Sequence, residues 1–412
     1  MMNSIMNTRI LQNLKTKNVL IGITGGIAAY KSCHLIRFFK KSGYEVKIII
    51  TKNGLQFITE TTLRTLSGNV VYSDTFSNNN EWSTEHISIT DWADIFIIAP
   101  ATANIIGKYA NGIADDALST SLLAYNKQVI IAPAMNDKMY NNPAVQRNIS
   151  LLQGQGVFFV EPGYGDLACG YKASGRMAEP EEIFRESLYF LNKTKKLEGR
   201  KILISAARTM EFIDPVRYIS NCSSGKTGFR LAEASSYKGA ESVLVTGPTD
   251  EVCNSFVKRI DVVSSDDMYR EIIRESKDSD CIIMSAAVAD YTLKKSEGKI
   301  KKSGDELKLD LIKTKDILKE LGSLKKKGQI LVGFALETEK GIPNAKKKLA
   351  EKNLDMIILN ETSKDNPAFG TDSNRITIIT KNTIEKLPSM DKSEIADIIL
   401  EKITALFNRG TE

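Results

Sequence analysis

The residues best suited to chemistry in this chain follow two short apolar runs in its first half. Residues 94–100 and 129–133 are rich in isoleucine and end in proline, which is typical of strands buried on both faces of a sheet. Small and polar residues come directly after them, with Thr102 and Asn104 after the first run and Asn136 after the second. In a parallel α/β sheet, such residues lie beyond the carboxyl ends of the strands, where ligands bind.

One of the two histidines, His86, precedes the first of these strands. An imidazole titrates near neutral pH and can therefore exchange a proton with a substrate. We predict that residues 86–142 form one wall of an active site. The other histidine, His34, lies in a predicted helix and is given no role.

The elements that must position these residues begin with a strand, a glycine turn and a helix. A strand over 18–23 runs into the motif 22–31, and a helical pattern follows to Lys41. Glycines let backbone N–H groups approach an anion, and a helix N-terminus favours negative charge. The spacing is not GxGxxG, and no acidic ribose ligand follows the second strand, 44–50, which ends in a polar turn at Thr51. This pattern favours a mononucleotide such as FMN over NAD, and the alternative is a tight turn without a ligand.

The remaining first half continues the alternation of helices and strands. Helices are predicted over residues 56–66, 114–125 and 181–191, a strand over 157–160, and a loop over 73–85. Residues 161–177 are rich in glycine and carry Cys169. A loop of this length and composition predicts a functional lid.

The strand-and-helix pattern restarts at Lys201, after a charged stretch. A second small-residue turn, 220–228, opens a helix. Further strands are predicted over 201–205, 241–245, 260–263, 280–285, 329–335, 354–359 and 375–379, with a closing helix over 392–406. Two phosphate-binding starts predict two doubly wound, Rossmann-like α/β domains with mainly parallel sheets. We place them at 18–191 and 201–412, with a linker at 192–200 and a disordered tail at 1–17.

Composition narrows the classes of function. The 412 residues carry a formal net charge of +6, and their lysine clusters at 299–302, 325–327 and 346–348 lack interleaved aromatic residues, which disfavours nucleic-acid binding. The five cysteines are odd in number and contain no CxxC pair, which disfavours a disulfide framework or a zinc site and favours the cytoplasm. No run approaches the roughly 20 apolar residues that span a membrane.

At this point the order of the motifs resembles a known family. The chain is similar to the bacterial bifunctional phosphopantothenoylcysteine decarboxylase / phosphopantothenate–cysteine ligases of coenzyme A biosynthesis, from residue 18 to the end. The resemblance is carried by residues 22–31, His86, 100–115, 133–136, 167–177, 214–217, 221–228, 286–291 and 299–302. It implies an N-terminal flavodoxin-like flavoprotein domain and a C-terminal nucleotide-binding ligase domain.

For the first half, the resemblance implies FMN-dependent decarboxylation of 4′-phosphopantothenoylcysteine to 4′-phosphopantetheine. His86 matches the base, Cys169 the acid and Asn136 the group that holds the substrate carboxylate. From residue type alone, His86 could also be a solvated loop histidine, Cys169 a packed thiol and Asn136 a turn residue. The residues implied to contact FMN are Gly22, Thr24, Gly25, Gly26, Thr51, Thr102, Asn104 and Asp115.

For the second half, the resemblance implies CTP-dependent ligation of 4′-phosphopantothenate with L-cysteine through an acyl-cytidylate. Lys299 matches the catalytic lysine, and Asp290 is a candidate ligand for the nucleotide or for a Mg²⁺ ion that bridges phosphates. Phe334 would lie near the cytosine. The other implied substrate or nucleotide residues are Asn221, Ser223, Gly225, Ala286, Ala287, Lys302 and Lys348.

Two departures from the family pattern bear on backbone geometry. Ala207, followed by Arg208, and Ala173 stand where the family usually has glycine, and alanine at a positive φ costs about 1 kcal/mol.

The resemblance also implies homo-oligomers, with trimer-based flavin sites and dimeric ligase domains. A decarboxylase of peptidyl cysteine or a flavin prenyltransferase would leave residues from 201 onward unexplained. The alternative from another class is a non-catalytic flavin-binding regulatory protein.

Overall fold

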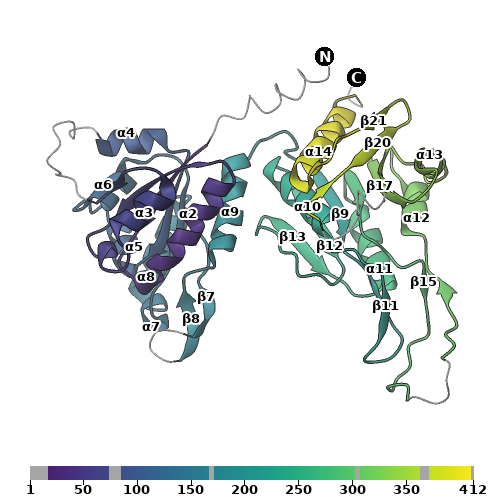
Figure 1. The fold of residues 1–412 in the computed structure, drawn as a ribbon, viewed down its shortest axis with the longest axis horizontal. Coiled ribbons are helices and arrows are strands. Elements are labelled where there is room, and N and C mark those ends of the chain that lie inside the picture. The colour runs from purple at the N-terminus through teal and green to yellow at the C-terminus, as the bar shows by residue number, and fades with distance from the viewer. Residues whose placement is uncertain (1–16, 74–84, 167–170, 302–306, 362–370, 410–412) are drawn as a thin grey trace. The chain divides into compact units, whose positions relative to one another are not determined.

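The computed structural model describes residues 17–73, 85–166, 171–301, 307–361 and 371–409. The chain forms two compact units, Met1–Leu191 and Asn192–Glu412 (Figure 1). Cys169, Lys302 and residues 1–16 of the tail predicted at 1–17 lie outside the described residues, as does the side chain of His86. Among the described residues, no helix has the length and apolar character to cross a membrane.

A six-stranded parallel sheet in the order β3-β2-β1-β4-β5-β6 forms the centre of the first unit. The strands are β1 (Asn18–Ile23), β2 (Glu45–Ile50), β3 (Val71–Tyr72), β4 (Ile95–Ala101), β5 (Val129–Pro133) and β6 (Phe158–Phe159). The order reverses between β1 and β4, so the connections that leave these two strands diverge and open a crevice at their carboxyl ends. Without the short edge strand β3, the order is the flavodoxin-like one.

Helices cover both faces of this sheet (Figure 1). They are η1 (Ile27–Lys31), α2 (Ser32–Lys41), η2 (Gly54–Gln56), α3 (Glu60–Ser67), α4 (Glu85–Trp92), α5 (Ala103–Ala110), α6 (Ala117–Ala124), α7 (Asp137–Tyr140), α8 (Pro143–Gly154) and α9 (Pro180–Asn192). Side chains of α2, α3 and α9 fill the core on one face, and those of α4, α5, α6 and α8 fill the core on the other. The helix starts are set by side-chain caps: Thr59 for α3, Asp116 for α6 and Asn142 for α8.

The first unit differs from the sequence prediction at its less regular segments. The predicted lid contains a hairpin of β7 (Gly163–Asp166) and β8 (Lys172–Arg176). His86 lies in the first turn of helix α4, which begins at Glu85, and most of the loop predicted over 73–85 lies outside the described residues. The predicted helix over 114–125 begins later, at Ala117, because Asp116 forms a capping box with Ser119.

The second unit contains an eight-stranded sheet in the order β13-β12-β9-β14-β17-β18-β20-β21. Its strands are β9 (Lys201–Ala206), β12 (Glu241–Thr246), β13 (Val257–Asp261), β14 (Cys281–Met284), β17 (Ile330–Glu337), β18 (Met356–Glu361), β20 (Ile376–Thr380) and β21 (Ile384–Lys386). The pairs from β13 to β18 are parallel, and β20 and β21 are antiparallel additions. This sheet reverses between β9 and β14 and so has its own crevice. The prediction of two doubly wound, mainly parallel α/β domains is confirmed.

The helices of this unit again lie on both faces. They are α10 (Lys226–Tyr237), α11 (Ser265–Ser276), α12 (Ile317–Leu324), α13 (Gly341–Glu351) and α14 (Lys392–Arg409). One core contains side chains of α10 and α14, and the opposite core contains those of α11, α12 and α13. Short strand pairs extend from the sheet: β10 (Met210–Phe212) with β11 (Tyr218–Ser220), β15 (Tyr291–Thr292) with β16 (Ile312–Lys313), and β19 (Ser373–Asn374) with β22 (Met390–Asp391).

The residues predicted as a linker pack onto the second unit. The backbone N–H of Thr194 donates to the carbonyl of Tyr237 at 2.7 Å, and that of Leu197 donates to the carbonyl of Lys238 at 2.8 Å. The side chain of Leu197 is 1% exposed and belongs to the core beside α10 and α14. The chain therefore enters the second unit several residues before its first strand.

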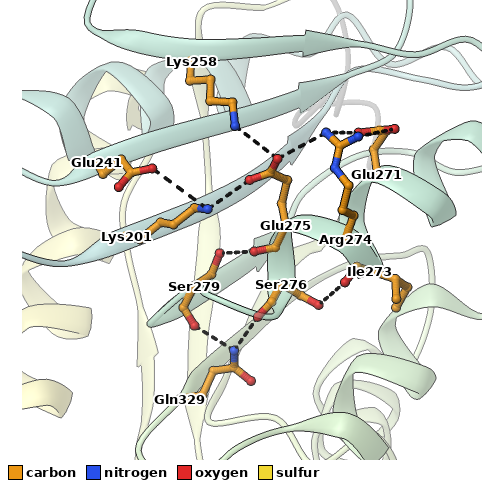
Figure 2. Close-up of polar contacts among 10 residues, drawn as sticks. All are labelled: Lys201, Glu241, Lys258, Glu271, Ile273, Arg274, Glu275, Ser276, Ser279 and Gln329. Atoms are coloured by element: carbon orange, nitrogen blue, oxygen red, sulfur yellow. Dashed lines mark hydrogen bonds and ion pairs between the residues drawn. The ribbon is translucent and has the colours of Figure 1, made fainter.

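An ionic network joins β9, β13 and helix α11 (Figure 2). The Glu275 carboxylate, 8% exposed, accepts hydrogen bonds from Lys201 at 3.0 Å, Lys258 at 3.1 Å and Arg274 at 3.2 Å. Burial alone would raise the pKa of Glu275, but these three hydrogen bonds outweigh burial and lower the pKa to about 2. The carboxylate therefore stays ionised in the folded protein and holds α11 to the sheet.

Candidate active sites

The first candidate site is a cavity of about 550 Å³ beyond the carboxyl ends of β1, β4 and β5. It is lined by Gly25, Gly26, Ile27, Ala28, Tyr30, Lys31, Thr102, Ala103, Ala134, Met135, Asn136, Met139, Gly175, Arg176 and Met177. Four of the residues singled out from the sequence, Gly25, Gly26, Thr102 and Asn136, thus share one cavity. Its mixture of apolar side chains and a few polar groups is typical of a site for a small organic cofactor and substrate.

Thr24 joins the two loops that meet at the sheet reversal. Its hydroxyl donates to the carbonyl of Pro100 at 2.8 Å and accepts from the backbone N–H of Thr102 at 3.1 Å. The side chain is 2% exposed, so it positions the cavity wall rather than lining it. Gly25 is required next to it, because a Cβ there would lie 2.5 Å from the Cβ of Asn53.

Asn136 lies at the end of β5 as the N-cap of α7. Its side-chain oxygen accepts from the backbone N–H of Lys138 at 2.9 Å, and its amide nitrogen donates to the Tyr171 hydroxyl at 3.0 Å. The strand β8 approaches this turn closely, since Met135 N–H donates to the Gly175 carbonyl at 3.0 Å. A Cβ on Gly175 would lie 2.3 Å from the Met135 carbonyl oxygen, and its φ is +142°.

Lys31 contributes a buried cation that the sequence reasoning did not single out. It is 7% exposed, and its ammonium donates to Glu179 at 2.7 Å and to the Met177 carbonyl at 3.4 Å. The signal was present, since Lys31 ends the glycine motif at 22–31 and Met177 ends the glycine-rich loop. The contact joins Lys31 to residues about 150 positions further along the chain, and a local sequence pattern does not reveal such a contact. Tyr30, Met135, Met139 and Arg176 also line the cavity without having been predicted.

Four other residues predicted to contact FMN lie outside the cavity lining. Gly22 packs inside β1, where a Cβ would lie 2.6 Å from Leu118 and 2.7 Å from Ile98. The Thr51 hydroxyl accepts from the N–H of Gly54 at 3.1 Å, and Asp115 pairs with Lys108 at 2.6 Å. Asn104 is exposed in the first turn of α5. Direct contact of these four with the cofactor stays a prediction, as do the roles of His86 and Cys169.

The second candidate site is a cavity of about 780 Å³ at the reversal of the second sheet. The predicted residues Asn221, Ser223, Gly225, Ala286, Ala287, Asp290, Phe334 and Lys348 all line it. Additional lining residues that were not predicted include Lys313, Lys315, Lys352, Asn374 and Lys392. The strands that supply them are far apart in the sequence, so only the folded sheet reveals the set.

The glycine turn before α10 is held against the end of β9. Gly225 is the N-cap of α10 with φ +91°, and a Cβ there would lie 2.9 Å from the Cβ of Ala207. Ala207 itself has φ +62°, a left-handed conformation that alanine adopts at a cost. The cost expected for alanine at positive φ therefore applies at Ala207. Ala173 instead lies in β8 opposite Gly165 and is not among the described residues with positive φ.

Asn221 fixes the facing turn of the second cavity. Its amide nitrogen donates to the carbonyls of Ala287 at 3.0 Å and Val288 at 3.3 Å. The hydroxyl of Thr209 accepts from the N–H of Ala289 at 3.0 Å and holds the same turn from behind. These hydrogen bonds fix the turn at 286–289 against Asn221 and Thr209, so this wall of the cavity is held in one conformation.

Lysines supply positive charge to this cavity, and several are already paired. Lys348 contacts Glu337 at 2.7 Å, and Lys226 at the start of α10 contacts Asp372 at 2.6 Å. Lys392 is 5% exposed, and burial together with the nearby charge of Lys226 lowers its pKa. An anionic ligand here would find cations whose geometry is set by neighbouring carboxylates.

The segment that carries Lys299 is fastened by the motif at 214–217. The buried carboxylate of Asp214 accepts from the N–H of Ile300 at 3.2 Å and from the Arg217 guanidinium, which donates to the Ile300 carbonyl at 3.0 Å. The hydrogen bond from Arg217 holds the pKa of Asp214 well below its usual range. Lys299 is exposed and is not among the lining residues, so its catalytic role stays a prediction.

Among the described residues, no three His, Cys, Asp or Glu side chains gather in a way that could bind a metal ion. Asp290 lines the second cavity as a single carboxylate. A Mg²⁺ ion usually binds through one or two carboxylates together with substrate phosphates, so this arrangement fits an ion that arrives with a nucleotide.

Comparisons with known proteins cover both units. The Flavoprotein family model matches residues 7–192, and the model for the DNA/pantothenate metabolism flavoprotein C-terminal domain matches residues 197–407. The chain is 46% identical over 404 residues to the coenzyme A biosynthesis bifunctional protein CoaBC of Bacillus subtilis, covering 97% of this chain and 99% of that protein.

Two further matches are a decarboxylase and the solved structure of a C-terminal domain. A cysteine/cysteine sulfinic acid decarboxylase from an unknown prokaryotic organism is 47% identical over 356 residues, covering 85% of this chain and 99% of that protein. The crystal structure of the C-terminal domain of a CoaBC protein is 38% identical, with a TM-score of 0.46, covering 52% of this chain and 100% of that one.

Proposed function

The chain belongs to the family of coenzyme A biosynthesis bifunctional proteins, and from this membership we propose that it makes 4′-phosphopantetheine in two steps. The second unit joins 4′-phosphopantothenate to L-cysteine at the expense of CTP. The first unit then decarboxylates the 4′-phosphopantothenoylcysteine that results. The observation that carries this proposal is that each unit has its own cavity at the reversal of its own sheet, lined by residues of the corresponding predicted site.

In the first unit, we propose that the cofactor is FMN. FMN, when bound, supplies the oxidation and reduction of the cysteine end that make the loss of CO₂ possible. The residues that would hold it are those of the glycine turn and of the turn after β4, Gly25, Gly26 and Thr102, which line the cavity together. Asn136 binds the substrate carboxylate, while His86 accepts a proton and Cys169 returns one.

In the second unit, we propose that CTP activates the carboxylate of 4′-phosphopantothenate as an acyl-cytidylate, with release of pyrophosphate. The carboxylate oxygen attacks the α-phosphorus, and the cysteine amine later displaces CMP from the acyl carbon. Backbone N–H groups at the start of α10, which lines the cavity, stabilise the phosphates, and Lys299 adds positive charge. Mg²⁺ dependence, homo-oligomeric assembly and a cytoplasmic location are parts of this proposal.

A second candidate function follows from the decarboxylase that is 47% identical over 356 residues. An enzyme that uses the first cavity for free cysteine or cysteine sulfinic acid would release CO₂ from either compound without CTP. The lining of the second cavity, where eight residues implied by the family resemblance meet, favours the two-step proposal instead.

One coupled assay tests both candidates. The purified protein is expected to be yellow, and with 4′-phosphopantothenate, L-cysteine, CTP and Mg²⁺ it should form 4′-phosphopantetheine, which mass spectrometry detects. Omission of CTP should stop product formation. Release of CO₂ from free cysteine or cysteine sulfinic acid, with no product from 4′-phosphopantothenate, would replace the proposal by the second candidate.

A further inference from the structure

The hydrogen bonds between the first cavity and β8 single out one tyrosine beside the residue proposed to bind the substrate carboxylate. Tyr171 precedes β8, and its hydroxyl contacts both Asn136 and Asp137. Tyr171 is not itself among the residues that line the cavity, whereas Asn136 is. Asn136 therefore connects the Tyr171 hydroxyl to the cavity.

The hydrogen-bond chain has a single consistent direction. The backbone N–H of Lys138 can only donate, so the Asn136 atom that it contacts at 2.9 Å must be the amide oxygen. The other end of the amide is then the NH₂ group, which donates to the Tyr171 oxygen at 3.0 Å. The Tyr171 hydroxyl in turn donates to the Asp137 carboxylate, which can only accept when ionised.

This direction matters for recognition of a carboxylate. An amide nitrogen carries two hydrogens, so donation of one to Tyr171 fixes the direction in which the other points. A chain that ends on a carboxylate is charge-assisted, which strengthens each bond in it and holds the amide in one orientation. The Asn136 oxygen, which would repel a carboxylate, is meanwhile held by α7.

Strand β8, which follows Tyr171 directly, approaches the turn that carries Asn136 closely. Met135 donates its N–H to the Gly175 carbonyl at 3.0 Å, and no side chain fits at Gly175 because a Cβ would lie 2.3 Å from the Met135 oxygen. Strand β8 is therefore seated directly on the turn that carries Asn136.

We propose that Tyr171 is a positioning residue that aims the Asn136 NH₂ group at the carboxylate of the decarboxylation substrate. The inference rests on the proposed decarboxylation of 4′-phosphopantothenoylcysteine. It assigns to Tyr171 a role in substrate selection, because the carboxylate is the group that the substrate has and the product lacks.

The test compares two constants of the FMN-loaded, full-length protein in a Tyr171→Phe variant. The KM for 4′-phosphopantothenoylcysteine should rise about tenfold, the effect of one lost hydrogen bond to a polar group, with kcat nearly unchanged. The inhibition constant of 4′-phosphopantetheine, which has no carboxylate, should stay within about twofold. The matched control is Tyr164→Phe on the neighbouring strand β7, whose side chain is 72% exposed, and it should leave both constants unchanged.

A double variant shows whether the effect passes through Asn136. In an Asn136→Ala background, Tyr171→Phe should cause no further rise in KM. An unchanged KM in the single variant, an equal rise in both constants, or an additive effect in the double variant would each overturn the positioning role. If the unmodified protein releases no CO₂ from the substrate, the proposed function fails and the inference falls with it. CTP-dependent pyrophosphate release by the second unit verifies that the variants are folded.

Discussion

Single residues decide how closely the loops of each site can approach one another. Gly25, Gly175 and Gly225 each stand where an added Cβ would lie within 3 Å of a neighbouring atom. Ala207 faces Gly225 and has φ +62°, so the end of β9 combines a strained alanine with a glycine that has no room for a side chain. The geometry of the second cavity therefore depends on the small size of both residues.

We expect Ala207→Val to destabilise the second unit by about 2–4 kcal/mol, because a β-branched residue at positive φ adds strain to overpacking. Ala207→Gly should change stability by less than about 1 kcal/mol, since relief of strain offsets the greater freedom of the unfolded chain. Scanning calorimetry of the full chain measures both, and release of flavin reports whether the first unit is unchanged. Equal stability of the two variants would show that the left-handed conformation is not retained in solution.

At the scale of elements, the motif at 214–217 is hydrogen-bonded to the segment that carries Lys299. Residues 214–217 hold the backbone of Ile300 by two hydrogen bonds. The carboxylate of Asp214 accepts from the N–H of Ile300, and the guanidinium of Arg217 donates to its carbonyl. The backbone N–H of Ser296 also donates to the carbonyl of Ile213 at 2.9 Å. The position of Lys299 thus depends on the β10–β11 hairpin rather than on its own sequence.

We therefore expect Asp214→Asn to lower CTP-dependent pyrophosphate release by about tenfold, because loss of the charge weakens each hydrogen bond that it accepts. Decarboxylation by the first unit should be unaffected. Lys299→Gln provides the comparison, since both changes should impair the same step. A normal rate of pyrophosphate release in Asp214→Asn would show that the hydrogen bonds of Asp214 are not needed for the ligase reaction.

The network around Glu275 gives a second prediction at this scale, one that depends on pH (Figure 2). Its pKa falls from 4.5 to about 2 on folding, so its contribution to stability is fully present above pH 4.5 and is lost as the pH falls toward 2. Glu275→Gln should cost about 2 kcal/mol at pH 7. In urea titrations, the difference in the free energy of unfolding between the unmodified protein and Glu275→Gln should become smaller as the pH falls from 5 to about 3. A difference in the free energy of unfolding that does not vary with pH would show that the charge of Glu275 does not stabilise α11.

The sequence predicted regular elements better than the contacts between them. The glycine turn after β1 and the buried strands β4 and β5 were evident, because buried parallel strands are continuous apolar runs. The edge strand β3 has two residues and no pattern of its own. Lys31 and Lys392 were missed for another reason: a lysine beside a motif resembles any surface lysine until the fold buries it. Eight of the residues implied by the family resemblance line the second cavity, whereas Lys299 does not line it and Gly22 and Asp115 have packing or ionic partners elsewhere.

At the scale of the whole molecule, two complete sheets and two cavities imply two reactions that can be blocked separately. We expect Asn136→Ala to leave the CTP-dependent step intact while 4′-phosphopantothenoylcysteine accumulates, because Asn136 lies in the first unit alone. Liquid chromatography with mass spectrometry of the coupled reaction measures the intermediate, and Lys299→Gln supplied with that intermediate should still form 4′-phosphopantetheine. Loss of both activities in either variant would show that the units depend on one another.

The packing of residues 193–200 determines where the two halves can be divided for separate expression. Helix α9 ends at Asn192, whereas Thr194 and Leu197 already bond to the end of α10. A second half that started at Lys201 would lack Leu197 and expose part of the core between α10 and α14, which should make it prone to aggregation. A half that starts at Lys193 keeps that side chain and is the piece expected to stay soluble by itself.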